Sequence, residues 1–499
     1  MVGQLNRFIA LASCVSCTLA KSTLFEHGTV ITFDEETQTA QYQRNTSLLI
    51  TDDRIAAIFD HTQTNVTIPP DTEVIDATDD IISPGFIDTH RHVWQTVHRS
   101  LGGDTVLGEY LTRWSSPLTA GIFDPEIMYY SELTGLCEAL DAGVTTLVDY
   151  ASGGFTREIA DASIQANLDS GIRSFYAYAI GRGMAGFPME DQIDHFQAIM
   201  ENQTSSLFSL GLAYETFDVG TREDIEEVAR IARTSNISLL ETHFVGGPFG
   251  VSNSPTILAQ LGLLNESFPI IFVHGNSATV TDATLLRENN QYIAMAPEFE
   301  MHHGADSYSA TLIQDQASLS VGTHYTFSGD LVSQARIWLQ TVRNTLFPRA
   351  IRDFKFPVTT PMSSSQAFLL ATRSGGLALR RPDLGVLRPG AKADVVVFDG
   401  SAPGLLGWSD PITAVILQSH VGHVKHVMVD GQWRKRAGEL RCAPEQQDVQ
   451  AKFLSLSRKV QAYWARTPGP DLEGAAPGTG ALYSAMDRID VVRGPMDGF

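Results

Sequence analysis

The middle of the chain alternates short apolar runs with amphipathic stretches, and this alternation restricts the fold more than any other feature. It is typical of units in which a helix joins two parallel strands. Helices are expected at residues 132–142, 156–170, 222–233 and 333–344. Strands are expected at residues 81–88, 144–149, 173–179, 208–213, 237–241, 270–273, 292–296 and 319–327. This pattern predicts the α/β class, as a closed (β/α)8 TIM-like barrel.

The two ends of the chain have a different pattern. Short alternating strands fill residues 24–80, and similar strands return at 394–399 and 424–429. We therefore expect one small β-sandwich built from both chain ends. The predicted domains are a signal peptide (1–20), the two halves of the β-sandwich (21–80 and 386–440), the catalytic barrel (81–385), and a C-terminal helix and tail (441–499).

The first twenty residues resemble a secretory signal peptide. One positive charge precedes an apolar stretch at residues 8–20, which ends in small residues and is too short for a membrane anchor. The alternative is a frayed or buried N-terminal segment. N-x-S/T sequons favour a secreted or secretory-pathway glycoprotein, and they begin at Asn45, Asn65, Asn202, Asn236 and Asn265.

Charge and cysteine content limit the partners. The chain has 57 acidic and 35 basic residues, a net charge of −22, which argues against nucleic acid or an anionic membrane as a partner. A small-molecule substrate is expected, and a homo-oligomer is left open. Cys14 and Cys17 lie in the expected signal peptide, and Cys137 and Cys442 are far apart. We expect neither a disulfide framework nor a cysteine-ligated metal.

The first expected barrel strand ends in Asp88-Thr89-His90-Arg91-His92. Residues two apart on a strand point to the same face, so His90 and His92 can aim two imidazoles at one point. Barrel enzymes carry their chemistry at this end of the strands, and converging imidazoles suit zinc. The alternative is a pair of solvated loop histidines.

Other strand ends also carry polar residues. His243 follows the fifth strand and His274 the sixth, so His90, His92 and His243 are the predicted metal ligands, with His274 beside them. No lysine occurs between Lys21 and Lys355, which excludes a bridging carboxylated lysine and predicts a single metal ion. The last two strands lead to further candidates, namely Glu298, Glu300, His324 and Asp330.

Three segments together resemble the amidohydrolase superfamily, and within it the cytosine-deaminase and triazine-hydrolase-like branch. They are P-G-F-I-D-T-H-R-H (84–92), E-A-L-D-A-G-V-T-T-L-V-D (138–149) and G-V-L-R-P-G-A-K-A-D-V-V-V-F-D (385–399), in a resemblance over roughly residues 24–440. The resemblance implies one Zn²⁺ or Fe²⁺ held by His90, His92, His243 and an eighth-strand aspartate. It implies that His274 contacts the activated water or the substrate, and that a C–N bond is hydrolysed.

Two positions depart from this family pattern. Deaminases of the branch have a glutamate three residues after the fifth-strand histidine, where this chain has Gly246. The eighth-strand aspartate, usual in an L-G-x-D run, is expected to be replaced by Gly322, with Asp330 either a substitute ligand or a helix cap. The proton acceptor would then be His274, His324 or Glu298.

These observations predict a metal-dependent hydrolase acting on the C–N bond of an amide, cyclic amide or amidine. The alternative suggested by Gly322 is a metal-dependent lyase or isomerase on the same scaffold. A barrel retained only for binding is the third possibility, and the converging histidines argue against it because buried, unpaired imidazoles are costly.

Overall fold

The computed structural model describes residues 22–60, 66–114, 117–183, 186–203, 205–246, 252–305, 313–323, 325–442, 446–469 and 472. The expected signal peptide and the Asn65 sequon lie outside these ranges. Within them, no helix combines the length and apolar character needed to cross a bilayer.

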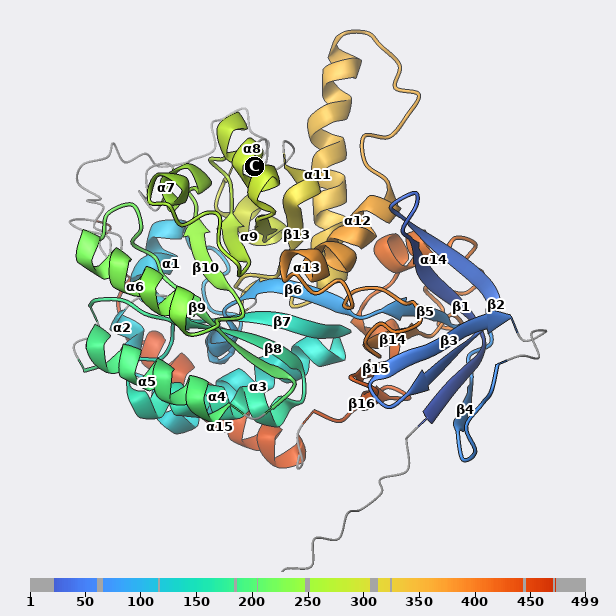
Figure 1. Ribbon diagram of the computed structural model, residues 1–499, viewed down its shortest axis with the longest axis horizontal. Coiled ribbons are helices and arrows are strands. Elements are labelled where there is room, and N and C mark those ends of the chain that lie inside the picture. Colours follow the sequence, from blue (N-terminus) through green and yellow to red (C-terminus); the bar gives the residue numbers. More distant parts are fainter. Residues whose placement is uncertain are drawn as a thin grey trace, which may run out of the picture.

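Eight parallel strands form the predicted barrel (Figure 1). In sheet order they are β6 (Phe86–Arg91), β7 (Val144–Ala151), β8 (Arg173–Ala179), β9 (Phe208–Ala213), β10 (Leu240–Phe244), β11 (Ile270–His274), β12 (Tyr292–Met295) and β13 (Ala317–Leu319). Just past β13, Gly322 N–H donates to the His90 carbonyl at 2.9 Å and the Gly322 carbonyl accepts from His92 N–H at 3.0 Å. These bonds join the last strand to the first.

The barrel strands are buried along their length, as expected for strands covered on both sides. All five residues of β11, for example, are buried. Helices cover the outside, and their first turns are capped by side chains: Thr156 accepts from Ile159 N–H at the start of α4, and Thr279 and Asp282 form a capping box at α8. The surrounding helices are α3 (Pro125–Asp141), α4 (Arg157–Ser170), α5 (Met189–Asn202), α6 (Arg222–Thr234), α7 (Pro255–Gln260), α8 (Val280–Asn289), α9 (Pro297–His302), α11 (Leu331–Arg352), α12 (Ser364–Ala371) and α13 (Arg373–Ala378).

Both chain ends build one nine-stranded mixed sheet beside the barrel, which confirms the predicted small β-domain. The antiparallel pairing of β5 with β14 joins the N-terminal half of the sheet to the C-terminal half. Its strands are β1 (Ser22–Asp34), β2 (Thr39–Thr51), β3 (Arg54–Asp60), β4 (Glu73–Asp76), β5 (Ile81–Pro84), β14 (Val395–Phe398), β15 (Val424–Val429), β16 (Gln432–Arg436) and β17 (Glu439–Leu440).

Three strand predictions were wrong in extent, one of them the fifth strand, expected over 237–241 and observed as β10. The stretch expected as one strand over 81–88 is divided at Gly85: β5 belongs to the β-domain and β6 to the barrel. A Cβ at Gly85 would lie 2.0 Å from Thr145 Oγ1, so the chain needs glycine where it passes between the two sheets. The eighth strand, expected over 319–327, is the shorter β13.

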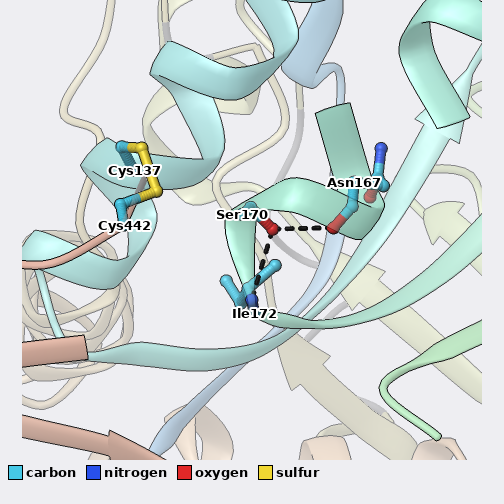
Figure 2. Close-up of a disulfide and its surroundings, with 5 residues drawn as sticks. All are labelled: Cys137, Asn167, Ser170, Ile172 and Cys442. Carbon is cyan, nitrogen blue, oxygen red and sulfur yellow. Dashed lines mark hydrogen bonds between the residues drawn. A yellow bond between two sulfur atoms is a disulfide. The ribbon is translucent and has the colours of Figure 1, made fainter. Parts of the chain in front are cut away.

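A disulfide joins Cys137 on α3 to Cys442, although the sequence did not lead us to expect a disulfide framework (Figure 2). The two lie 305 residues apart, so their spacing carried no signal. Four residues after Cys442 the described chain resumes as α15 (Gln446–Trp464), the predicted C-terminal helix. This helix packs on α3 and on the short helix η1 (Val93–His98). The bridge therefore ties the C-terminal helix to the barrel wall.

Candidate metal centre

Three histidines meet at the C-terminal end of the barrel. His90 lies in β6, His92 follows it before η1, and His243 lies in β10. One ring nitrogen from each lies within 4.8 Å of the others, and His90 Nε2 is 3.1 Å from His92 Nε2. The structure thus brings together the three side chains that the sequence predicted as metal ligands.

Glutamates fix the orientation of two of these rings. Glu241 Oε1 lies 2.8 Å from His90 Nδ1, and Glu215 Oε1 lies 2.8 Å from His243 Nδ1. With Nδ1 held by a carboxylate, Nε2 is the atom left for a ligand, the arrangement that commonly supports metal-binding histidines. The sequence prediction assigned no role to either glutamate. Glu241 lies two residues before His243 on β10 and so points to the same side, a signal that could have identified it.

Burial keeps His90 and its partner Glu241 uncharged in the absence of a cation. It lowers the pKa of His90 well below its usual value, and the neighbouring histidines lower it further. Burial also raises the pKa of Glu241 well above that of an ordinary carboxyl. A neutral imidazole is the form that ligates a metal. A cation at the three nitrogens would supply the missing charge and favour the carboxylate form of Glu241.

The ring of Tyr150, at the end of β7, packs against the three histidines. Its ring centroid lies 4.8 Å from that of His243, 5.0 Å from that of His92 and 5.4 Å from that of His90. Its hydroxyl donates to Glu215 Oε1. Burial, followed by the Glu215 charge, raises the pKa of this phenol well above its usual value, so it is a stable neutral donor.

Glu215 is the most open of the glutamates bonded to these histidines. Its side chain is 33% exposed, whereas that of Glu241 is 0% and that of Glu300 is 6% exposed. Burial by itself would raise the pKa of Glu215, but His243 and the Tyr150 hydroxyl outweigh it, and the net pKa is lowered. Glu215 is therefore a carboxylate at the open side of the cluster.

His274 ends β11 beside the three histidines. Its backbone is left-handed, with φ of 75°, its Nδ1 lies 3.0 Å from Glu300 Oε1, and its ring stacks on Phe299 at 5.1 Å. Its ring centroid is 5.6 Å from that of His243. Burial lowers the pKa of His274 despite the opposing effect of Glu300. Its Nε2 is thus available as a neutral hydrogen-bond acceptor.

The remaining predicted residues lie elsewhere. Glu298 accepts from Ser328 N–H at 2.9 Å and from Gln334 Nε2 at 3.1 Å, so it holds a loop to α11. Asp330 caps α11 by accepting from Ser333 N–H at 2.7 Å, the alternative that the sequence had left open. Neither contact directs these carboxylates to the three histidines. His324 lies outside the described residues.

Both glycines at which the chain departs from the family pattern have a left-handed backbone. Gly246 has φ of 68°, and a Cβ there would lie 2.1 Å from Ser277 Oγ, so no glutamate fits without moving its neighbour. Gly322 has φ of 67° and lies beside β6, where its N–H and carbonyl bond to the backbone of His90 and His92. The replacement of the aspartate at this place stays a prediction.

Comparison with known proteins agrees with this geometry. Residues 221–434 match the amidohydrolase family. A 5-methylthioadenosine/S-adenosylhomocysteine deaminase from Pyrococcus horikoshii is 26% identical over 442 residues, which cover 84% of this chain and 96% of that protein. A 5'-deoxyadenosine deaminase from Methanosphaera stadtmanae is 24% identical over 405 residues, covering 78% of this chain and 89% of that protein.

Solved structures share the fold. An adenosine deaminase from Xanthomonas campestris with bound zinc superposes with a TM-score of 0.75 at 18% identity, covering 89% of this chain and 99% of that one. A mutant atrazine chlorohydrolase from Arthrobacter aurescens, complexed with zinc and atraton, superposes with a TM-score of 0.73 at 20% identity, covering 87% and 100%. The barrel with its attached sheet is therefore the architecture of these enzymes.

Proposed function

We propose that this chain, which carries an amidohydrolase family domain, is a metal-dependent hydrolase that uses water to cleave a C–N bond in a small molecule. The observation that carries the proposal is the meeting of His90, His92 and His243 at one end of the barrel. Two of the three rings are oriented by glutamates through Nδ1. A binding-only barrel would not need this arrangement.

The residues fit one zinc ion. Three neutral imidazoles leave room in a tetrahedral site for a fourth ligand, as in catalytic zinc centres. When bound, zinc would polarise the substrate and lower the pKa of a coordinated water to near neutrality. Three imidazoles can also bind Fe²⁺. We propose zinc because two structural neighbours were solved with zinc bound.

The chain's own groups supply orientation and proton transfer. His274 can accept a proton at Nε2, because Glu300 fixes its Nδ1. Tyr150 stays protonated, and its hydroxyl donates a hydrogen bond to Glu215, which holds His243 in place. Glu298 and Asp330 are engaged in loop and helix contacts and are not part of this proposal.

We propose a planar nitrogen heterocycle as the substrate class. Deaminases of adenosine-type nucleosides are the relatives reported above, and an aromatic cluster that includes Tyr110, Phe299 and Tyr325 extends from His274. Aromatic rings offer stacking surfaces to planar ligands. Neither the relatives nor the structural neighbours favour the lyase or isomerase alternative.

The test measures ammonia release and oxygen incorporation. Zinc-loaded protein is incubated in ¹⁸O-labelled water with adenosine, 5-methylthioadenosine, guanine and a cyclic amide. Hydrolysis incorporates one labelled oxygen into the product, and His243→Asn should abolish it. A product without label would contradict hydrolysis and support a lyase or isomerase.

We also propose that the protein enters the secretory pathway. Support comes from the Cys137–Cys442 disulfide, since disulfides persist in oxidising compartments. The four sequon asparagines within the described residues are exposed, namely Asn45, Asn202, Asn236 and Asn265.

Expression in a eukaryotic host should yield secreted protein whose mass falls on treatment with peptide N-glycosidase. Intracellular, unglycosylated protein with free thiols would contradict it.

A further inference from the structure

Helix α11 extends well beyond the barrel that it covers. Its buried residues all lie between Leu331 and Val342. The second half and the segment that returns to α12 project from the rest of the described chain (Figure 1). We call residues 343–362 the arm. Arg343 pins its base by donating to the Met362 carbonyl at 3.1 Å.

The tip of the arm is strongly apolar. Phe354 is fully exposed, Phe356 is 89% exposed, Val358 is 87% exposed and Ile351 is 61% exposed. Large side chains of this kind are rarely left in water without a function. Together they present roughly 500–700 Å² of apolar surface, which approaches the ~800 Å² that each partner contributes to a stable interface.

The charge of the arm is opposite to that of the chain. The arm carries Arg343, Arg349, Arg352 and Lys355 against a single acid, Asp353, while the whole chain has 57 acidic and 35 basic residues. Two arms would repel each other through these cations, whereas an arm and the acidic body of another copy would attract. Charge therefore favours docking of the arm on the body of a second molecule.

We propose that the arm is a dimerisation element that docks its apolar tip on a second copy of this chain. In a twofold dimer each copy gives and receives one arm, so the buried apolar area is doubled. The proposal is independent of the catalytic proposal, because the arm contributes no residue to the histidine cluster.

The test compares the mass of the protein in solution with that of arm variants, by sedimentation velocity at 0.1–20 µM protein, a range chosen to span about micromolar affinity. The wild type is expected to be a dimer, and Phe354→Ser/Phe356→Ser is expected to dissociate at least tenfold more readily. A Val74→Ser/Leu406→Ser variant, which removes exposed apolar residues elsewhere, should remain dimeric. Circular dichroism and the melting temperature of the monomeric variant would show that it is folded.

A charge variant tests the second part of the argument. Arg352→Glu/Lys355→Glu should weaken the dimer and reduce its dependence on salt. A monomeric wild type, or a dimer that survives in the double serine variant, would overturn the proposal. Flotation of a monomeric wild type with phosphatidylserine vesicles, lost in the serine variant, would overturn it in favour of a membrane-binding arm.

Discussion

His243 Nδ1 and Glu215 Oε1 lie 2.8 Å apart, and this contact connects β10 to the segment that follows β9 at the mouth of the candidate metal centre. Glu215 also accepts from the Tyr150 hydroxyl, so one carboxylate orients a ligand ring and an aromatic ring that covers it. The first prediction concerns this carboxylate. Glu215→Gln should weaken metal binding by about 10–100-fold, because the amide orients His243 less strongly.

Competition with a chelator measures this affinity. Glu226→Gln is the matched control, since Glu226 lies exposed on α6 and pairs only with Arg222 among the contacts described for it. Equal affinity in Glu215→Gln and the wild type would show that the contact does not support the metal.

The Tyr150→Phe variant distinguishes two roles of Tyr150, namely covering the three histidines with its ring and donating a hydrogen bond to Glu215. The ring stays against the three histidines while the donor to Glu215 is lost, so metal content should remain at the wild-type level. We expect kcat to fall by about tenfold, on the scale of ~1.4 kcal/mol for one hydrogen bond to a charged group. Elemental analysis and steady-state kinetics test this, and loss of metal from the variant would contradict the assigned role.

We predict that the folded protein loses stability in acid because of His98. It is fully buried among Trp94, Trp114 and Trp464, and neither of its ring nitrogens has a hydrogen-bond partner within the described chain. Burial lowers the pKa of His98 to about 3. Between this value and the ordinary 6.5 the unfolded state binds more protons than the folded state.

The stability contribution of neutral His98 is therefore complete above pH 6.5 and lost as the pH falls toward 3. The loss should reach roughly 3–5 kcal/mol. Urea unfolding of the metal-free protein measures it, and His98→Phe should flatten the pH dependence. The exposed His302→Gln is the control. An unchanged slope in His98→Phe would show that other groups cause the acid sensitivity.

The Cys137–Cys442 disulfide should stabilise the packing of α15. Replacing both cysteines by serine is expected to cost about 2–5 kcal/mol, and the reduced wild type should behave like the variant. Thermal unfolding with and without reductant measures this. Identical melting temperatures for oxidised and reduced protein would mean that packing on α3 and η1 holds α15 without the bridge.

Periodicity was sufficient to predict the barrel and four residues at its rim. His90 and His92 are two apart at a strand end, and His243 and His274 end their own strands, so position alone brought them to one rim. The division at Gly85 was missed because the apolar pairs on either side of it were taken as one strand, although Ser83-Pro84-Gly85 is a break signal.

The supporting residues were harder to predict. Glu215 follows β9 in no recognisable motif, and its contacts with His243 and Tyr150 join residues 28 and 65 positions away. For Asp330 the sequence left open a substitute ligand or a helix cap, and its carboxylate caps the first turn of α11. The contacts of Glu215 are tertiary and leave no local pattern.

The most direct test of the account is the metal content of purified protein after zinc supplementation and dialysis. The account predicts one zinc ion per chain in the wild type and almost none in His90→Asn or His243→Asn, with both variants still folded by circular dichroism. A wild type without stoichiometric metal, or variants that retain it, would contradict the claim that these histidines form a metal centre.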